Sequence, residues 1–135
     1  MTIEQLEKIE WLNRAYHANN KANSLLAVNE ENKKLKELSS ICTGEKKKEI
    51  IKTIESNENK INEYVDYLAK LRNEIGEAIS SINDDECEAI LNYRYLAYKT
   101  MEKISDLMHY DKSTVQRKHK KAIEKLLLKS TPCMV

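Results

Sequence analysis

Apolar residues recur every seven positions through residues 50–82. The first heptad position is apolar throughout and holds Ile54, Ile61, Leu68, Ile75 and Ile82. Its companion position holds Ile50, Asn57, Tyr64, Leu71 and Ala78. This repeat predicts one long helix with a coiled-coil seam, formed chiefly by Ile54, Ile61, Leu68, Leu71 and Ile75. The polar Asn57 is predicted to fix the register or the pairing, at some cost in stability.

The segment before this repeat, about residues 3–39, is also predicted to be helical. Its apolar anchors are Ile3, Leu6, Ile9, Leu12, Tyr16, Leu25, Leu26, Leu35 and Leu38. The Asn-rich stretch HANNKANS favours a helix poorly, so the sequence signal for a helix is weaker there. The stretch SSICTGEKKK contains a glycine and indicates a reversal between two antiparallel helices. Residues 1–82 are therefore predicted to form a helical hairpin that packs on itself, on a second copy, or on both.

Residues 83–129 are predicted to form three short helices joined by connectors of about four residues. Asn83 is the candidate N-cap of the first helix, and acids fill its first turn. Thr100 is the candidate cap of the second helix. Ser113 is the candidate cap of the last, which we expect from about 114 to 129, with Pro132 beyond its end. Helix-turn-helix units have this layout.

The composition agrees with an all-α fold, because the 135 residues include only 2 glycines and 1 proline. So few turn-forming residues exclude a chain of many hairpin strands. We expect a helical hairpin and oligomerisation arm at 1–82, a helix-turn-helix DNA-binding domain at 83–130, and a tail at 131–135.

The location is expected to be cytoplasmic, without a membrane. No apolar run approaches the roughly 18 residues of a membrane span, and the N-terminal stretch MTIEQLEKIEW is too acidic for a signal peptide. The three cysteines lie far apart and form no C-x-x-C pair, so neither disulfides nor a zinc site is expected.

Positive charge concentrates near the C-terminal end. Residues 111–129 carry seven cations and two acids, a net charge of +5, whereas residues 83–110 carry three cations and six acids. This gradient favours an anionic partner for the last helix. One face of that helix is apolar, with Val115, Ala122, Ile123 and Leu126. The opposite side carries Thr114, Gln116, Arg117, Lys118, Lys120, Lys121 and Glu124.

This division into two faces is typical of a DNA-recognition helix, because one face packs on the preceding helix and the other enters a groove. The residues predicted to read base edges are Thr114, Gln116, Arg117 and Lys120. Those predicted to hold phosphates are Lys112, Ser113, Lys118 and Lys121. A charged helix that binds nothing is the alternative, and the short helices and tight turn before it favour recognition.

The C-terminal part of the chain resembles region 4 of the sigma factors of bacterial RNA polymerase. The resemblance rests on ILNYRYLAYKTMEKISDLMHYDKSTVQRKHKKAIEKL and covers about 46 of the 135 residues. The chain departs from that pattern at His109, where the turn usually carries glycine, and at Met101, where the family carries an aromatic residue. Together with the predicted hairpin, this end is similar to the ArpU- and RinA-like regulators of late phage genes and to a related uncharacterised phage domain family.

The resemblance implies a phage or prophage transcription regulator that binds double-stranded DNA, with RNA polymerase as a further candidate partner. It implies no promoter opening, because nothing here resembles the sigma region that melts DNA. The coiled-coil seam would make the protein a homodimer. The alternative function is a protein-interaction module, in which the hairpin binds polymerase or a host factor and the helix-turn-helix reads no DNA.

No catalytic motif appears in the sequence. The acids Asp84, Asp85, Glu86 and Glu88 lack EF-hand spacing and are interpreted as helix N-terminal acids. A Gly-rich phosphate loop, a nucleophile elbow and an H-E-x-x-H motif are all missing. We therefore expect no enzyme activity, no cofactor and no metal, and we interpret His119 as a packing or flanking residue.

Overall fold

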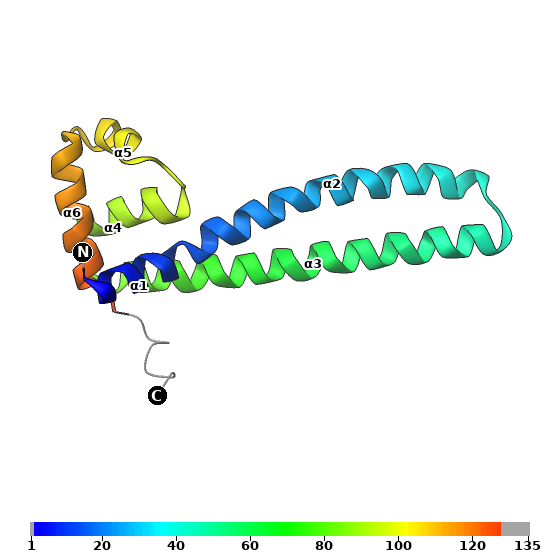
Figure 1. Cartoon of the computed structure of the whole chain (residues 1–135), viewed down its shortest axis with the longest axis horizontal. Helices are drawn as coiled ribbons and strands as arrows, with labels where there is room; N and C mark the ends of the chain where they lie inside the picture. The colour runs from blue at the N-terminus through cyan, green and yellow to red at the C-terminus, as the bar shows by residue number, and fades with distance from the viewer. Residues whose placement is uncertain (1, 128–135) are drawn as a thin grey trace. The chain divides into compact units, whose positions relative to one another are not determined.

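The computed structural model describes residues 2–127, and these residues are helical with no strand, which confirms the all-α class (Figure 1). The α-helices are α1 (Ile3–Leu12), α2 (Arg14–Ile41), α3 (Gly44–Ser80), α4 (Asp85–Leu91), α5 (Met101–Met108) and α6 (Lys112–Lys125). A π-helical turn, η1 (Asn92–Leu96), directly follows α4. Within this part of the chain, no helix is both long and apolar enough to cross a membrane.

The chain divides into two compact units, at boundaries that differ from the predicted segments. One, here called the composite unit, comprises Met1–His17 and the described part of Leu71–Val135. The other, here called the hairpin unit, is Ala18–Lys70. Both α1 and the last turns of α3 thus belong with the C-terminal helices rather than with the hairpin.

In the hairpin unit, α2 and α3 run antiparallel and reverse at residues 42–43, as the sequence predicts (Figure 1). The buried Asn32 donates from Nδ2 to the Ile54 carbonyl at 3.2 Å, and its Oδ1 accepts from Asn57 Nδ2 at 2.8 Å. Asn57 thus pairs with Asn32 between two helices of one chain, and its role in fixing the register remains a prediction. The helix predicted here is confirmed through the Asn-rich HANNKANS, because α2 is continuous there and its Ala18 lies buried.

The predicted seam residues are used largely inside a single chain. Leu71 and Ile75 are buried in the composite unit, and Ile54 is buried in the hairpin unit. Ile61 and Leu68 are half-buried. A role of this seam between two chains remains a prediction.

In the composite unit, α4, α5 and α6 share a core of one residue from each helix: Ile90, Ile104 and Val115. The apolar face predicted for the last helix is confirmed, because Val115, Ala122, Ile123 and Leu126 are all fully buried. Leu12 of α1, Ile75 and Ile79 of α3, and Leu91 of α4 are also buried in this unit. The core thus draws on both ends of the described chain.

Two of the three predicted caps are wrong. Thr100 does cap α5, accepting from the Lys103 N–H at 3.2 Å. However, Asp84 rather than Asn83 caps α4, and Asp111 rather than Ser113 caps α6. Both are carboxylates, which suit the positive end of a helix dipole better than a neutral cap.

The last helix is also shorter than predicted, because it ends at Lys125 rather than 129 and Leu126 is extended. The observed helix nevertheless contains every residue predicted to contact DNA. Pro132 and the predicted tail at 131–135 lie outside the described residues.

Candidate nucleic-acid interface

A turn of three residues joins α5 to α6 and sets their relative direction. Its first residue, His109, has a left-handed backbone, with φ 58° and ψ 38°. Histidine is more tolerant of positive φ than most residues other than glycine. The Ser105 hydroxyl donates to the Tyr110 carbonyl, and the Ser105 carbonyl accepts from the Tyr110 N–H at 3.2 Å. Asp111 then caps α6 by accepting from the Thr114 N–H at 3.2 Å.

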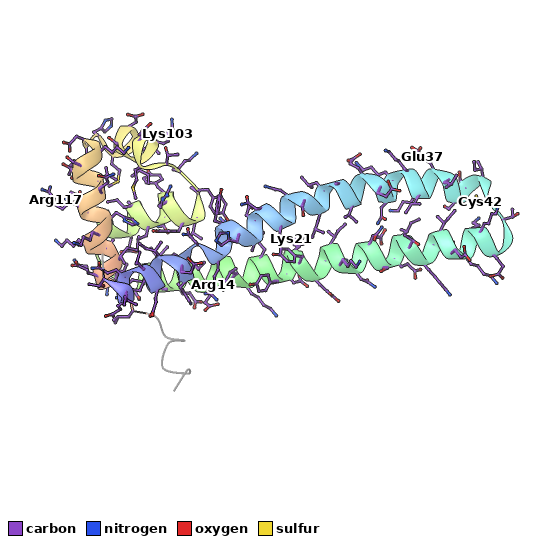
Figure 2. All side chains as sticks on the ribbon, in the orientation of Figure 1. Arg14, Lys21, Glu37, Cys42, Lys103 and Arg117 are labelled. Carbon is purple, nitrogen blue, oxygen red and sulfur yellow. The ribbon has the colours of Figure 1, made fainter. Side chains whose placement is uncertain are left out.

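The predicted DNA contacts lie together on α6. Six of the eight are exposed, and we call them the basic strip: Lys112, Ser113, Gln116, Arg117, Lys120 and Lys121. Figure 2 shows the Arg117 side chain on the side of α6 that faces away from α4. The other two, Thr114 and Lys118, are half-buried. The face of α6 opposite the strip is buried. The helix therefore has one packed face and one solvent-exposed face.

One flank of α6 is paired with the acidic start of α4. Lys125 Nζ lies 2.7 Å from Asp84 Oδ2, and Lys118 Nζ lies 3.4 Å from Glu86 Oε1. The Tyr110 hydroxyl also donates to Glu86. Hydrogen bonds from Lys125 and from the Cys87 N–H lower the pKa of Asp84 to about 2. The Tyr110 hydroxyl is likewise the main cause of a lowered Glu86 pKa.

These pairs commit Lys118 and Lys125 to holding α6 against α4. Among the described residues, by contrast, no carboxylate lies within 4.0 Å of the amino or guanidinium nitrogens of Arg117, Lys120 and Lys121. Lys112 makes only a long, exposed contact of 3.5 Å with Glu102. The basic strip therefore keeps three uncompensated cations for an anionic ligand.

The buried side of α6 contains a polar pair that the sequence did not predict. Tyr95 Oη lies 2.7 Å from His119 Nε2, and the two rings stack with centroids 5.7 Å apart. Tyr95 comes from the π-helical turn η1, in which the Ala97 N–H donates to the Asn92 carbonyl at 3.0 Å. Burial raises the pKa of Tyr95 to about 12 and lowers that of His119 to about 4. His119 is therefore a packing residue, held neutral in the folded chain.

This pair makes stability depend on pH. An unfolded histidine binds a proton near pH 6.5, whereas folded His119 binds one only near pH 4. The neutral His119 thus makes its full contribution to the stability of the folded chain above pH 6.5. This contribution is lost as the pH falls toward 4. We expect the free energy of unfolding to drop by about 2 kcal/mol between pH 7 and pH 5 from this group alone. Urea unfolding at each pH would measure it. His119→Gln should flatten that part of the profile, and an equal slope in the variant would contradict the assignment.

The first helix secures the other end of α6. Lys8 Nζ donates to the carbonyls of Ile123 and Glu124 at 3.3 and 3.4 Å. Gln5 Nε2 donates to Glu124 Oε1 at 3.0 Å. Gln5 and Lys8 are only 7% and 8% exposed, and the contact of Lys8 with the Ile123 carbonyl is buried. A cation at the negative end of the α6 dipole is favourable, and it leaves the N-terminal half of α6 free.

Comparison with known proteins does not identify a family for this chain. No protein-family model, no curated protein and no solved structure matches the chain. The residues that the structure describes contain no group of three or more His, Cys, Asp or Glu side chains able to hold a metal. A functional conclusion therefore has to rest on the arrangement of α5 and α6.

Proposed function

We propose that the protein is a transcription regulator that binds double-stranded DNA through α6. The observation that carries the proposal is the basic strip, an exposed row of hydrogen-bonding and cationic side chains on a helix whose opposite face is fully buried. The short helix α5, the turn at 109–111 and α6 have the order of a helix-turn-helix, whose second helix enters the major groove. The sequence supports this, because no acid occurs between residues 112 and 123.

The strip divides into two kinds of contact. Arg117 and Lys120 suit guanine, Gln116 suits adenine, and Thr114 at the edge of the strip suits either. Lys112, Ser113 and Lys121 suit phosphates. Lys118 would reach a phosphate only by leaving Glu86, so it should contribute least of the predicted phosphate residues.

The wider role rests on the resemblance to sigma region 4. It favours regulation of transcription, with RNA polymerase as a second partner and a phage or prophage origin. The alternative is a protein-interaction module that keeps the helix-turn-helix shape but reads no DNA. The two differ in their response to salt, because each phosphate contact contributes about −0.9 to the slope of log K against log salt.

Selection of bound duplexes from a random DNA pool, at about 0.15 M salt, tests the proposal. We expect the wild type to enrich a defined motif, whereas Arg117→Ala/Lys120→Ala should not. Each truncation of a base-reading residue should cost about 1–3 kcal/mol of binding. A matched control is Lys60→Ala/Lys70→Ala, which removes two exposed cations of α3 in the hairpin unit. Failure of the wild type to enrich any sequence would favour the interaction module.

A further inference from the structure

The side of α6 that faces α4 carries a row of lysines. Lys118, Lys121 and Lys125 follow one another at spacings of three and four residues, which places them on one side of the helix. The start of α4 lies beside this row (Figure 1) and brings two carboxylates to it. Asp84 pairs with Lys125, and Glu86 pairs with Lys118. The acids of α4 therefore occupy two cations of a helix that is otherwise rich in positive charge.

The contact between Glu86 and Lys118 joins three elements of the composite unit. Lys118 Nζ lies 3.4 Å from Glu86 Oε1 and 5.1 Å from the centre of the Tyr110 ring. The Tyr110 hydroxyl donates to Oε2, the other carboxylate oxygen of Glu86. Tyr110 lies in the turn between α5 and α6, where Ser105 bonds both its N–H and its carbonyl. The carboxylate and the ring beside the Lys118 ammonium group are thus each held by further contacts.

The pair remains open to water. The side chain of Lys118 is 27% exposed and that of Glu86 is 47% exposed. An ion pair as exposed as this contributes little to stability, so Lys118 can leave Glu86 for another anionic oxygen. A DNA phosphate offers such an oxygen, and lysine binds phosphate as a point charge. Glu86 therefore occupies Lys118 in the same way that a phosphate would.

We propose that Glu86 competes with DNA phosphates for Lys118 and so lowers the affinity of α6 for duplex DNA of any sequence. The inference rests on the proposed function, because it concerns a cation of the helix to which DNA binding is assigned. The competition acts on the part of binding that does not depend on sequence, since phosphate contacts supply that part. Removing the charge of Glu86 should therefore strengthen binding and make it more sensitive to salt.

Fluorescence anisotropy with a labelled duplex of mixed sequence, at several salt concentrations, tests the competition. At low salt, Glu86→Gln should bind this duplex about two- to fivefold more tightly than the wild type, the range that corresponds to an exposed ion pair. The variant should also gain one phosphate contact, which makes the slope of log K against log salt steeper by about 0.9. Between about 50 and 200 mM salt, that contact adds roughly 3.5-fold to the loss of affinity.

Asp85→Asn is the matched control on the same helix. It removes an exposed carboxylate next to Glu86, and Asp85 pairs with no cation of the described chain. This variant should bind like the wild type, because exposed charges without a close partner are largely screened. Lys118→Gln alone should change binding little. In the Glu86→Gln background, however, Lys118→Gln should abolish the gain, because two residues in contact do not act additively.

The outcomes separate this inference from the proposed function. Equal affinity and equal salt slope for Glu86→Gln and the wild type would overturn the inference and leave DNA binding intact. A gain that persists after Lys118 is also replaced would overturn it as well, because the charge of Glu86 would then act without Lys118. If neither the wild type nor Glu86→Gln binds any duplex, the proposed function fails and the inference fails with it.

Discussion

A fragment of residues 83–135 should show no cooperative unfolding transition, although it contains the whole helix-turn-helix segment predicted from the sequence. In the folded chain, the composite unit also contains Leu12 of α1 and Ile75 and Ile79 of α3, all buried to within 1%. Arg72 of α3 donates to the Leu96 carbonyl at 3.1 Å, and Lys8 of α1 donates to the end of α6. Removing these segments would expose the apolar surfaces they cover, and each buried Leu or Ile is worth roughly 1.5–3 kcal/mol.

The control for this fragment is a chain that joins residues 1–17 to residues 71–135 through a flexible Gly/Ser linker. We expect this chain to unfold cooperatively, because it contains the composite unit entire. Thermal melts followed by circular dichroism would distinguish the two. The fluorescence of Trp11, the only tryptophan, would report on the linked chain. A cooperative melt of residues 83–135 alone would show that α1 and α3 are dispensable to this core.

Ile104→Ala should be the most destabilising single substitution of α5. Ile104 is fully buried and joins Ile90 and Val115 in the core that connects three helices. Truncating a buried isoleucine to alanine costs about 2–5 kcal/mol, because transfer energy is lost and a cavity remains. Folded domains have a free energy of unfolding of about 5–15 kcal/mol. The substitution should therefore remove a large fraction of this free energy.

Urea unfolding monitored through Trp11 would give the change in midpoint at constant slope. Leu107→Ala is the matched control on the same helix, because Leu107 is 41% exposed. Its cost should be within about 0.5 kcal/mol, as for other surface positions. Equal costs for the two variants would mean that α5 is not packed through Ile104.

The elements with strong periodicity were predictable. The heptads of α3 and the apolar face of α6 alternate regularly with polar residues, so both helices and the buried residues of α6 follow from spacing alone. The docking of α1 on α6 does not, since it depends on Gln5 and Lys8. Polar side chains of these types are mostly exposed, and a sequence does not show that a carbonyl more than 100 positions away will accept from one of them.

Helix starts were less predictable for a different reason. At Asn83-Asp84 and again at Asp111–Ser113, two good capping residues stand close together. Propensity ranks them nearly equal, and the tertiary pairing of Asp84 with Lys125 is not visible in the sequence. The π-helical turn that brings Tyr95 to His119 has no sequence signal of its own.

The candidate site was predictable as a set of residue types on one face of a helix. The sequence could not show that Lys118 would pair with Glu86, which lies 32 residues earlier. It therefore overstated the number of free cations. Whether the remaining ones read DNA is still a prediction, and the duplex selection decides it.

The contact between Lys8 and the last turn of α6 has a consequence for biosynthesis. The two partners are 115 residues apart, so on the ribosome α1 emerges long before the helix that it will hold. Chains are made at about 5–20 residues per second, so Gln5 and Lys8 of α1 wait several seconds or more for their partners on α6. A chain that stops before Ile123 would lack both carbonyls to which Lys8 donates.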